Sequence, residues 1–202
     1  FANLGLHERL LKALTELDFV EPTAVQQEAI PLALEGYDIR ATAQTGSGKT
    51  AAFVLPILHQ MLIDETRQPA TQALILAPTR ELAQQITQEV ERFARYTFLK
   101  PLLLIGGEGF KEQAAELRRV PDIIVATPGR LLEHLEAGNV IARDIRWLVL
   151  DEADRMLDLG FADAMQDIIR MCSNREQTLL FSATTGGRQL REITREVLNE
   201  PK

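Results

Sequence analysis

Short apolar runs alternate along this chain with longer stretches whose apolar residues recur at helical spacing. Each run is brief and almost continuously apolar, which is typical of strands covered by helices on both faces. We therefore predict a mostly parallel sheet whose strands are DIRATA, QALILA, PLLLI, DIIVA, WLVLD and QTLLF, at residues 38–43, 72–77, 101–105, 122–126, 147–151 and 177–181.

The stretches around these runs predict helices at 6–17, 50–62, 80–96, 110–119, 129–137, 161–171 and 187–198. Strands that alternate with helices are the signature of βαβ units. The expected fold is α/β, with a doubly wound sheet and helices on both faces. No internal repeat, low-complexity run or Gly/Ser linker interrupts the pattern, so we expect a single domain over residues 1–202.

Composition narrows the possible partners. Hydrophobic residues make up 46% of the chain, yet no apolar stretch approaches the roughly 20 residues that cross a bilayer, so we expect no membrane partner. The net charge of −7 argues against a broad basic field for nucleic acid, and any such contact must be local. The single cysteine, Cys172, lies in an apolar helical stretch, which predicts a buried, inert thiol and fits a reducing cytoplasm.

The segment AQTGSGKT at 43–50 follows the first predicted strand and opens a predicted helix, which is the context of a phosphate-binding P-loop. Gly46 and Gly48 let the backbone N–H groups face phosphates, and the helix N-terminus adds partial positive charge. Lys49 can then reach the β- and γ-phosphates, and the Thr50 hydroxyl can ligate Mg²⁺. The alternative is a glycine-rich turn with an incidental lysine. The predicted ATP-binding residues of this loop are Ala43, which stands in place of the usual first glycine, Gln44, Thr45, Gly46, Ser47, Gly48, Lys49 and Thr50.

The acidic segment DEAD, at 151–154, is a second indication of a nucleotide site, and it follows the apolar run WLVL. It falls at the carboxyl end of a predicted strand, where ligands of open α/β sheets bind. Asp151 is suited to hold Mg²⁺ through water, and Glu152 to orient and deprotonate the water that attacks the γ-phosphate. Alone, the cluster is also compatible with an acidic helix start. Together with the P-loop it predicts an ATP-hydrolysing site with Lys49, Asp151 and Glu152 as catalytic residues.

With AQTGSGKT and DEAD both present, the sequence resembles the DEAD-box family of ATP-dependent RNA helicases over essentially its whole length. The resemblance implies the N-terminal RecA-like motor domain, with ATP and Mg²⁺ as cofactors. Residues 19–26, FVEPTAVQ, are similar to the family's Q motif, although Asp18 stands where a glycine usually precedes its phenylalanine. By resemblance, the adenine site takes Gln26 as reader of the base edge, Thr23 as support, and the aromatic residues Phe1 and Phe19.

Three further segments are similar to the family's motifs for gripping RNA: PTRELA, a Gly-Gly pair and TPGR. Arginines can pair with phosphates, threonines can donate hydrogen bonds, and glycines allow close approach of the strand. Such contacts would bind RNA independently of sequence. Taken singly, PTRELA and TPGR are also compatible with capped helix starts. The predicted RNA-binding residues are Pro78, Thr79, Arg80, Gly106, Gly107, Thr127, Pro128, Gly129 and Arg130.

The tripeptide Ser182-Ala183-Thr184 is similar to the family motif that couples hydrolysis to strand separation, and we expect Ser182 and Thr184 to contact Asp154. The resemblance also implies a second motor domain of the same protein, which nothing in this chain matches. Its arginine finger is worth about 10³–10⁵ in rate, so this domain alone, expected to be monomeric, should bind nucleotide with little turnover.

Three other functions share parts of this signature. A DNA-directed helicase or translocase would have the same P-loop and acids, but the Q motif, PTRELA and TPGR together favour RNA. A small-molecule P-loop kinase would need an acceptor pocket and an arginine-rich lid. An ATP-binding scaffold without catalysis is the third, and the intact Lys49 and Glu152 argue against it.

Overall fold

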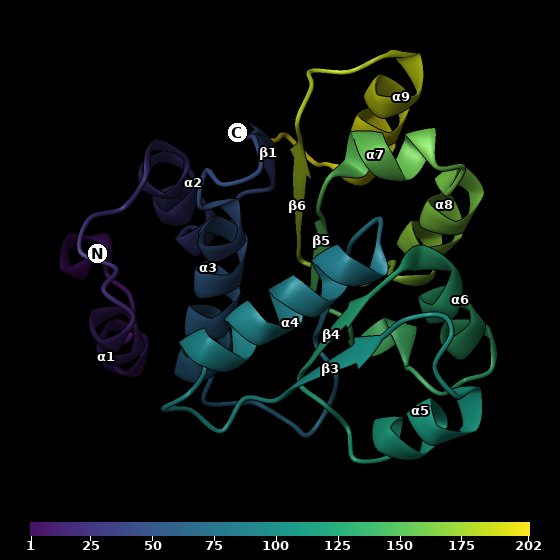
Figure 1. Ribbon diagram of the computed structural model, residues 1–202, viewed down its shortest axis with the longest axis horizontal. Coiled ribbons are helices and arrows are strands. Elements are labelled where there is room, and N and C mark those ends of the chain that lie inside the picture. Colours follow the sequence, from purple (N-terminus) through teal and green to yellow (C-terminus); the bar gives the residue numbers. More distant parts are fainter.

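The computed structural model describes residues 1–202, and its six strands form one sheet in which every neighbouring pair is parallel (Figure 1). The strand order is β1-β6-β5-β2-β4-β3. The predicted doubly wound α/β class is confirmed, and each predicted apolar run overlaps one strand. The strands are β1 (Ile39–Thr42), β2 (Ala73–Leu76), β3 (Pro101–Leu104), β4 (Ile123–Ala126), β5 (Trp147–Leu150) and β6 (Gln177–Ser182).

Helices cover both faces of this sheet, as Figure 1 shows, with α1 to α4 on one side and α6 to α9 on the other. Side chains alternate along a strand, so Leu148 and Leu150 pack into one hydrophobic core and Val149 into the other. The helices are α1 (Glu8–Glu16), α2 (Ala24–Leu34), α3 (Lys49–Ile63), α4 (Arg80–Phe93), α5 (Phe110–Leu117), α6 (Pro128–Glu136), α7 (Ala153–Asp158), α8 (Ala162–Met171) and α9 (Arg188–Val197), with 3₁₀ turns at Ala2–Leu4 and Ala142–Asp144.

The sequence prediction misses helices α2 and α7 and extends α4 too far. Helix α2 was not predicted; Pro31 lies inside it, but a capping box between Thr23 and Gln26 starts it, and its buried residues pack in the core. Helix α4 ends at Phe93 rather than at Tyr96, because the chain there tightens into turns in which Arg95 and Thr97 donate backbone bonds to residues three positions earlier. The prediction of a helix to residue 96 was therefore wrong.

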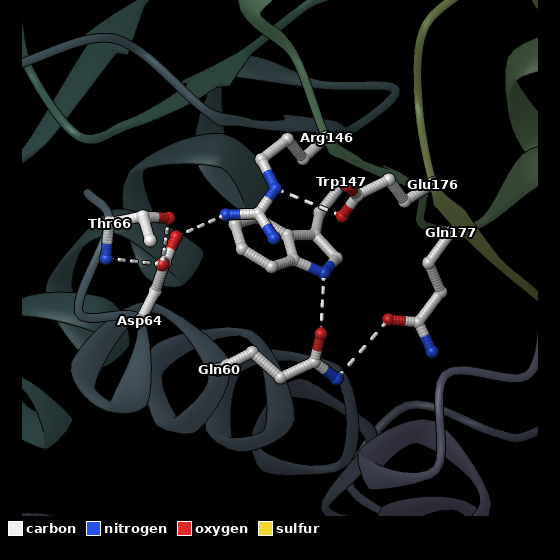
Figure 2. Close-up of polar contacts among 7 residues, drawn as sticks. All are labelled: Gln60, Asp64, Thr66, Arg146, Trp147, Glu176 and Gln177. Carbon is white, nitrogen blue, oxygen red and sulfur yellow. Dashed lines mark hydrogen bonds and ion pairs between the residues drawn. The ribbon is translucent and has the colours of Figure 1, made fainter. Parts of the chain in front are cut away.

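A polar cluster joins the end of α3 to the starts of β5 and β6 (Figure 2). The Trp147 indole N–H donates to Oε1 of Gln60 at 2.8 Å, and Gln177 Nε2 donates to the backbone carbonyls of Ala33 and Tyr37 at 2.9 and 2.6 Å. We call this cluster the amino-edge network; its members are Gln60, Asp64, Thr66, Arg146, Trp147, Glu176 and Gln177.

Arg146 lies on the solvent side of the amino-edge network and pairs with two of its acids. Its guanidinium lies 4.4 Å from the Trp147 ring centre and forms ion pairs with Asp64 at 2.6 Å and Glu176 at 2.9 Å (Figure 2). Because α3 runs opposite to the strands, the other ends of these elements meet at the carboxyl edge of the sheet. That edge holds the predicted nucleotide site.

Cys172 is buried, and this burial raises the pKa of its thiol to about 11. The predicted burial of this residue is confirmed, and a thiol with a raised pKa stays protonated at neutral pH. None of the helices combines the length and the apolar character that crossing a membrane requires.

Candidate active site

The phosphate loop connects β1 to α3, and two of its glycines adopt left-handed backbone conformations, with φ of 85° at Gly46 and 83° at Gly48. A Cβ atom at Gly48 would lie 2.5 Å from the side-chain nitrogen of Gln26 and 3.0 Å from the hydroxyl of Thr23. Glycine is therefore required there both for the backbone conformation and for the close approach of the neighbouring segment.

Lys49 is the first residue of α3, and its ammonium lies between two acids at the end of β5. Its Nζ is 2.9 Å from Asp151 Oδ1 and 3.1 Å from Glu152 Oε2. These residues are far apart in sequence, but the strand order places β1 and β5 on either side of β6, so the loop after β1 reaches the acids. The structure thus brings the three predicted catalytic residues into direct contact.

Asp151 is completely buried, and its backbone N–H donates to the carbonyl of Leu76 on the adjacent strand. Its carboxylate has the ion pair with Lys49 but no well-aligned hydrogen bond. Burial raises its pKa to about 6, although the charge of Lys49 opposes that rise. The protein therefore holds at this point a buried acid with free oxygen lone pairs, as a ligand for a hard cation requires.

Glu152 has a left-handed backbone conformation, with φ of 51° and ψ of 51°, which costs a non-glycine residue about 1–2 kcal/mol. At this turn the extended backbone of β5 ends and α7 begins. Asp151 therefore remains buried, while the Glu152 side chain reaches Lys49 and lines the cavity. Strain of this kind is commonly found at functional sites.

A cavity of about 340 Å³ opens beside the P-loop. Eight predicted site residues line it: Phe19, Gln26, Thr45, Gly46, Gly48, Lys49, Thr50 and Glu152. Sequence reasoning missed the rest of its wall, which consists of Ala51, Leu82, Gln85, Gln88 and Glu89. Four of these form one face of α4, and their spacing of three or four residues was the available signal.

The predicted Q-motif residues meet the P-loop directly. Gln26 is 2% exposed; its Oε1 accepts from the backbone N–H of Thr23 at 2.9 Å, and its Nε2 donates to the carbonyl of Gly48 at 3.0 Å. One N–H and one lone pair of the amide remain for a ligand. Phe1 does not line the cavity; its ring packs 6.0 Å from that of Phe19, which does.

The other loop residues lie outside this cavity. Ala43, Gln44 and Ser47 line a separate hollow between α2 and β1. The Gln44 side chain donates to the carbonyl of Ala183 at 3.3 Å, which connects the loop to the segment after β6.

The segment after β6 contacts the DEAD segment through one hydroxyl rather than two. Thr184 donates from both its backbone N–H and its hydroxyl to Asp154 Oδ2, at 3.2 and 3.1 Å, as predicted. The predicted contact of Ser182 with Asp154 is wrong. Ser182 is the buried last residue of β6, and its hydroxyl donates to the carbonyl of Thr184 at 2.6 Å, which closes the local turn.

The predicted RNA-binding residues lie on loops and helix starts at the carboxyl ends of β2, β3 and β4. Thr79 caps α4, with its hydroxyl accepting from the N–H of Leu82 at 3.2 Å. Thr127 precedes Pro128 at the start of α6 without a side-chain cap bond. Arg80 and Arg130 both reach the Ile105–Glu108 loop: a Cβ atom on Gly107 would lie 2.8 Å from Arg80 Nη1, and Arg130 donates to the carbonyl of Glu108 at 2.8 Å.

A glycine-rich loop that opens a helix, next to an acid pair at the end of a parallel strand two positions away in the sheet, defines a P-loop nucleotide-binding domain. The family model described as DEAD/DEAH box helicase matches residues 23–193. The chain belongs to the DEAD/DEAH box helicase family.

Known relatives are similar over the full length of this chain. A protein named DEAD-box ATP-dependent RNA helicase 28 from Oryza sativa subsp. japonica is 48% identical over all 202 residues, which correspond to 25% of that protein. ATP-dependent RNA helicase drs1 from Schizosaccharomyces pombe is 45% identical over 202 residues, 27% of its length. The chain thus spans about a quarter of the length of these curated relatives.

The fold is also similar to a solved structure. The crystal structure of a DEAD box protein from the hyperthermophile Methanococcus jannaschii superposes with a TM-score of 0.92 and 36% identity. The match covers all of this chain and 54% of the other, so a comparable further length of that protein has no counterpart here.

Proposed function

We propose that this chain is the ATP-binding motor domain of an ATP-dependent RNA helicase, which couples ATP hydrolysis to unwinding or remodelling of RNA duplexes. One observation carries the proposal: Lys49 of the P-loop lies against Asp151 and Glu152 at the mouth of a cavity that Gln26 also lines. The family membership and the names of the relatives, which are ATP-dependent RNA helicases, support the same function.

The residues of the site suit each step of phosphoryl transfer. The backbone N–H groups of Gly46 and Gly48 and the start of α3 receive the phosphates, and Lys49 leaves the carboxylates to neutralise the terminal phosphate. Glu152 is then free to orient the attacking water and accept its proton.

A magnesium ion also belongs to this proposal. The hydroxyl of Thr50 and the carboxylate of Asp151 are oxygen donors of the type that Mg²⁺ prefers, and the Asp151 oxygens lack well-aligned hydrogen bonds. When bound, Mg²⁺ would neutralise charge on the phosphate oxygens. Asp151 must be deprotonated to hold it.

We further infer that a second motor domain completes the site. The chain spans about a quarter of its relatives, and no arginine reaches the cavity from the side opposite to the P-loop. Since an arginine finger contributes about 10³–10⁵ in rate, the domain alone should bind nucleotide with little turnover. Helicase-like unwinding by this chain alone would contradict the inference.

Replacing Lys49 tests the nucleotide site. The Lys49→Ala variant should lose at least about 100-fold in affinity for Mg-ATP, because a hydrogen-bonded charge contact to phosphate is removed from a buried site. Isothermal calorimetry measures the affinity, and circular dichroism checks the fold. Glu152→Gln is the matched control: it should bind Mg-ATP within a few-fold of the parent and lose hydrolysis in the full-length protein. Unchanged affinity in Lys49→Ala would refute the site.

Adenine selectivity tests the role of the Q-motif segment. If Gln26 uses its remaining N–H and lone pair on the base, ADP should bind at least about tenfold more tightly than GDP, which corresponds to one or two neutral hydrogen bonds. Competition against a fluorescent nucleotide measures the ratio. Equal affinities for ADP and GDP would show that Gln26 does not recognise the base.

Replacing Arg80 or Arg130 tests the proposed RNA-binding surface. We expect each change to alanine, in the full-length protein, to weaken binding of single-stranded RNA of any sequence. The slope of log affinity against log salt concentration should also become shallower by about one. Competition with a DNA oligonucleotide of matching sequence then separates an RNA helicase from a DNA-directed one. Preference for DNA would favour the second function.

A further inference from the structure

Gln113, on α5, belongs to none of the predicted motifs, yet its side chain contacts one of them and the residue that precedes another. It is 5% exposed, its Nε2 donates to the carbonyl of Ile105 at 3.0 Å, and its Oε1 accepts from Arg130 Nη1 at 2.9 Å. Ile105 directly precedes the Gly106-Gly107 pair, and Arg130 is the arginine of TPGR. One buried amide therefore joins the loop after β3 to the helix after β4.

Chemistry fixes the orientation of this amide. A guanidinium has no acceptor, so the atom that faces Arg130 must be the oxygen and the nitrogen must face Ile105. His134 Nε2 also lies 2.9 Å from that oxygen, so Nε2 carries a proton and donates it. The other ring nitrogen, Nδ1, then accepts from the Asn139 side chain at 3.1 Å. The four side chains, Gln113, Arg130, His134 and Asn139, therefore have one consistent set of donors and acceptors.

The same cluster places an aromatic pair beside the Arg130 guanidinium. The His134 ring is fully buried and stacks on Phe110 with 4.2 Å between ring centres and 3° between planes, and the guanidinium of Arg130 lies 5.8 Å from the Phe110 ring centre. Arg130 Nη1 is shared between Gln113 and the carbonyl of Glu108. With Nη1 bound inward, the Nη2 group has no protein partner in this arrangement.

We propose that Gln113, oriented by His134, is a positioning residue for nucleic-acid binding: it fixes the Arg130 guanidinium and the Ile105–Glu108 loop relative to each other. The inference rests on the proposed function, since both partners belong to the proposed RNA surface. Arg80 lies against the same loop, so the cluster fixes Arg130 relative to a segment that a second cationic side chain of the proposed RNA surface also contacts.

The test uses the full-length protein with Gln113→Met, which keeps the length of the side chain and removes its three hydrogen bonds, to Ile105, Arg130 and His134. We expect the dissociation constant for a fluorescein-labelled oligouridylate to rise about five- to tenfold, the loss that follows when an immobilised arginine regains its rotamer freedom. The affinity for Mg-ATP should stay within about twofold. His134→Phe keeps the ring stack, loses the donor to Gln113, and should shift RNA binding in the same direction by a smaller factor.

Gln177 provides the matched control. It is 3% exposed and also donates from its amide to backbone carbonyls, but it lies in the amino-edge network (Figure 2). Gln177→Met should lower the melting temperature about as much as Gln113→Met and leave RNA binding unchanged. If both variants weaken RNA binding equally, or if neither does, Gln113 has only a structural role and the proposal is wrong.

The double variant separates this proposal from the function on which it rests. If Gln113 acts through Arg130, Gln113→Met should add little to the loss caused by Arg130→Ala, whereas independent effects would multiply. Independent effects would overturn the proposal. If Arg130→Ala itself leaves RNA affinity unchanged, the proposed RNA surface fails at that residue, and the positioning role fails with it.

Discussion

The two edges of the sheet are built from the same strands and the same helix, but they differ in how their polar groups are paired. At the amino edge, the Trp147 indole, the Gln177 amide and the Arg146 guanidinium all have partners within 2.9 Å. At the carboxyl edge, Asp151 has a buried carboxylate with a raised pKa, and Glu152 has a strained backbone. The amino edge stabilises the fold, and the carboxyl edge keeps binding capacity for a ligand.

This division is a general consequence of parallel α/β architecture. Strand carboxyl ends and helix N-termini meet at one edge and create a place for anions, and the opposite edge lacks this arrangement. Substitutions at the two edges should therefore have opposite effects on stability.

The largest change in stability is expected for Trp147→Phe at the amino edge. It leaves Oε1 of Gln60 without its indole donor and opens space in the core, so the free energy of unfolding should fall by about 2–4 kcal/mol. For a chain of this size, that corresponds to a drop of roughly 6–12 °C in melting temperature. Differential scanning calorimetry measures it. A loss of nucleotide affinity greater than about twofold would contradict the separation of the two edges.

The next effect has the opposite sign. Asp151→Asn removes a buried charge but leaves Lys49 paired with Glu152, so the nucleotide-free protein should gain about 1–2 kcal/mol of stability at pH 7. Mg-ATP hydrolysis by the full-length protein should be lost at the same time. Urea denaturation of both proteins measures the difference, and a less stable variant would show that the ion pair with Lys49 outweighs the cost of burial.

The pH dependence should sharpen this result. The pKa of Asp151 is raised from an ordinary 3.8 to about 6, so between these values the folded state binds a proton that the unfolded chain has released. Its contribution to stability is therefore favourable at low pH and is lost as pH rises from about 4 to 6, by at most about 1.4 kcal/mol per pH unit. The stability difference between the parent and Asp151→Asn should grow over this interval and stay constant above it. A difference independent of pH would contradict the raised pKa.

The smallest effect concerns an exception at the amino edge. Val120, before β4, has a left-handed backbone with φ of 55°, which is unfavourable for a β-branched residue, and its side chain is 43% exposed. Val120→Gly should relieve this strain and raise stability by about 0.5–1 kcal/mol, with no change in nucleotide or RNA affinity. Thermal unfolding measures the gain. An effect on either affinity would show that strain at this edge also has a function.

Much of the fold could be predicted because apolar runs such as WLVL and QTLLF are covered on both faces and stand out from their surroundings. Helix α2 could not be predicted from the sequence, because Pro31 lies inside it and its apolar and polar residues show no clear helical periodicity. The strand order could not be read from the sequence, since β1 pairs with β6 and β2 pairs with β5, although neither pair is consecutive along the chain.

The site was predictable where chemistry and spacing coincide, as for Lys49 and the DEAD acids. It was not predictable where a residue acts through a partner that only the fold brings near. Gln113 looks like any helical glutamine in the sequence, and the α4 wall of the cavity looks like the polar face of a surface helix. Ser182 was misassigned because the direction of a hydroxyl at a strand end depends on the turn that follows.

The position of the Lys49 ammonium between two carboxylates has a consequence for the order in which ligands bind. Two acids share one cation, so removing that cation to serve an incoming phosphate exposes two negative charges to each other and to the ligand. A replacement cation must arrive with the nucleotide, which makes the two bind as a unit. Nucleotide without a divalent metal should therefore bind more weakly than the metal complex. The same ion pairs of Lys49 should also disfavour the binding of metal-free polyphosphates.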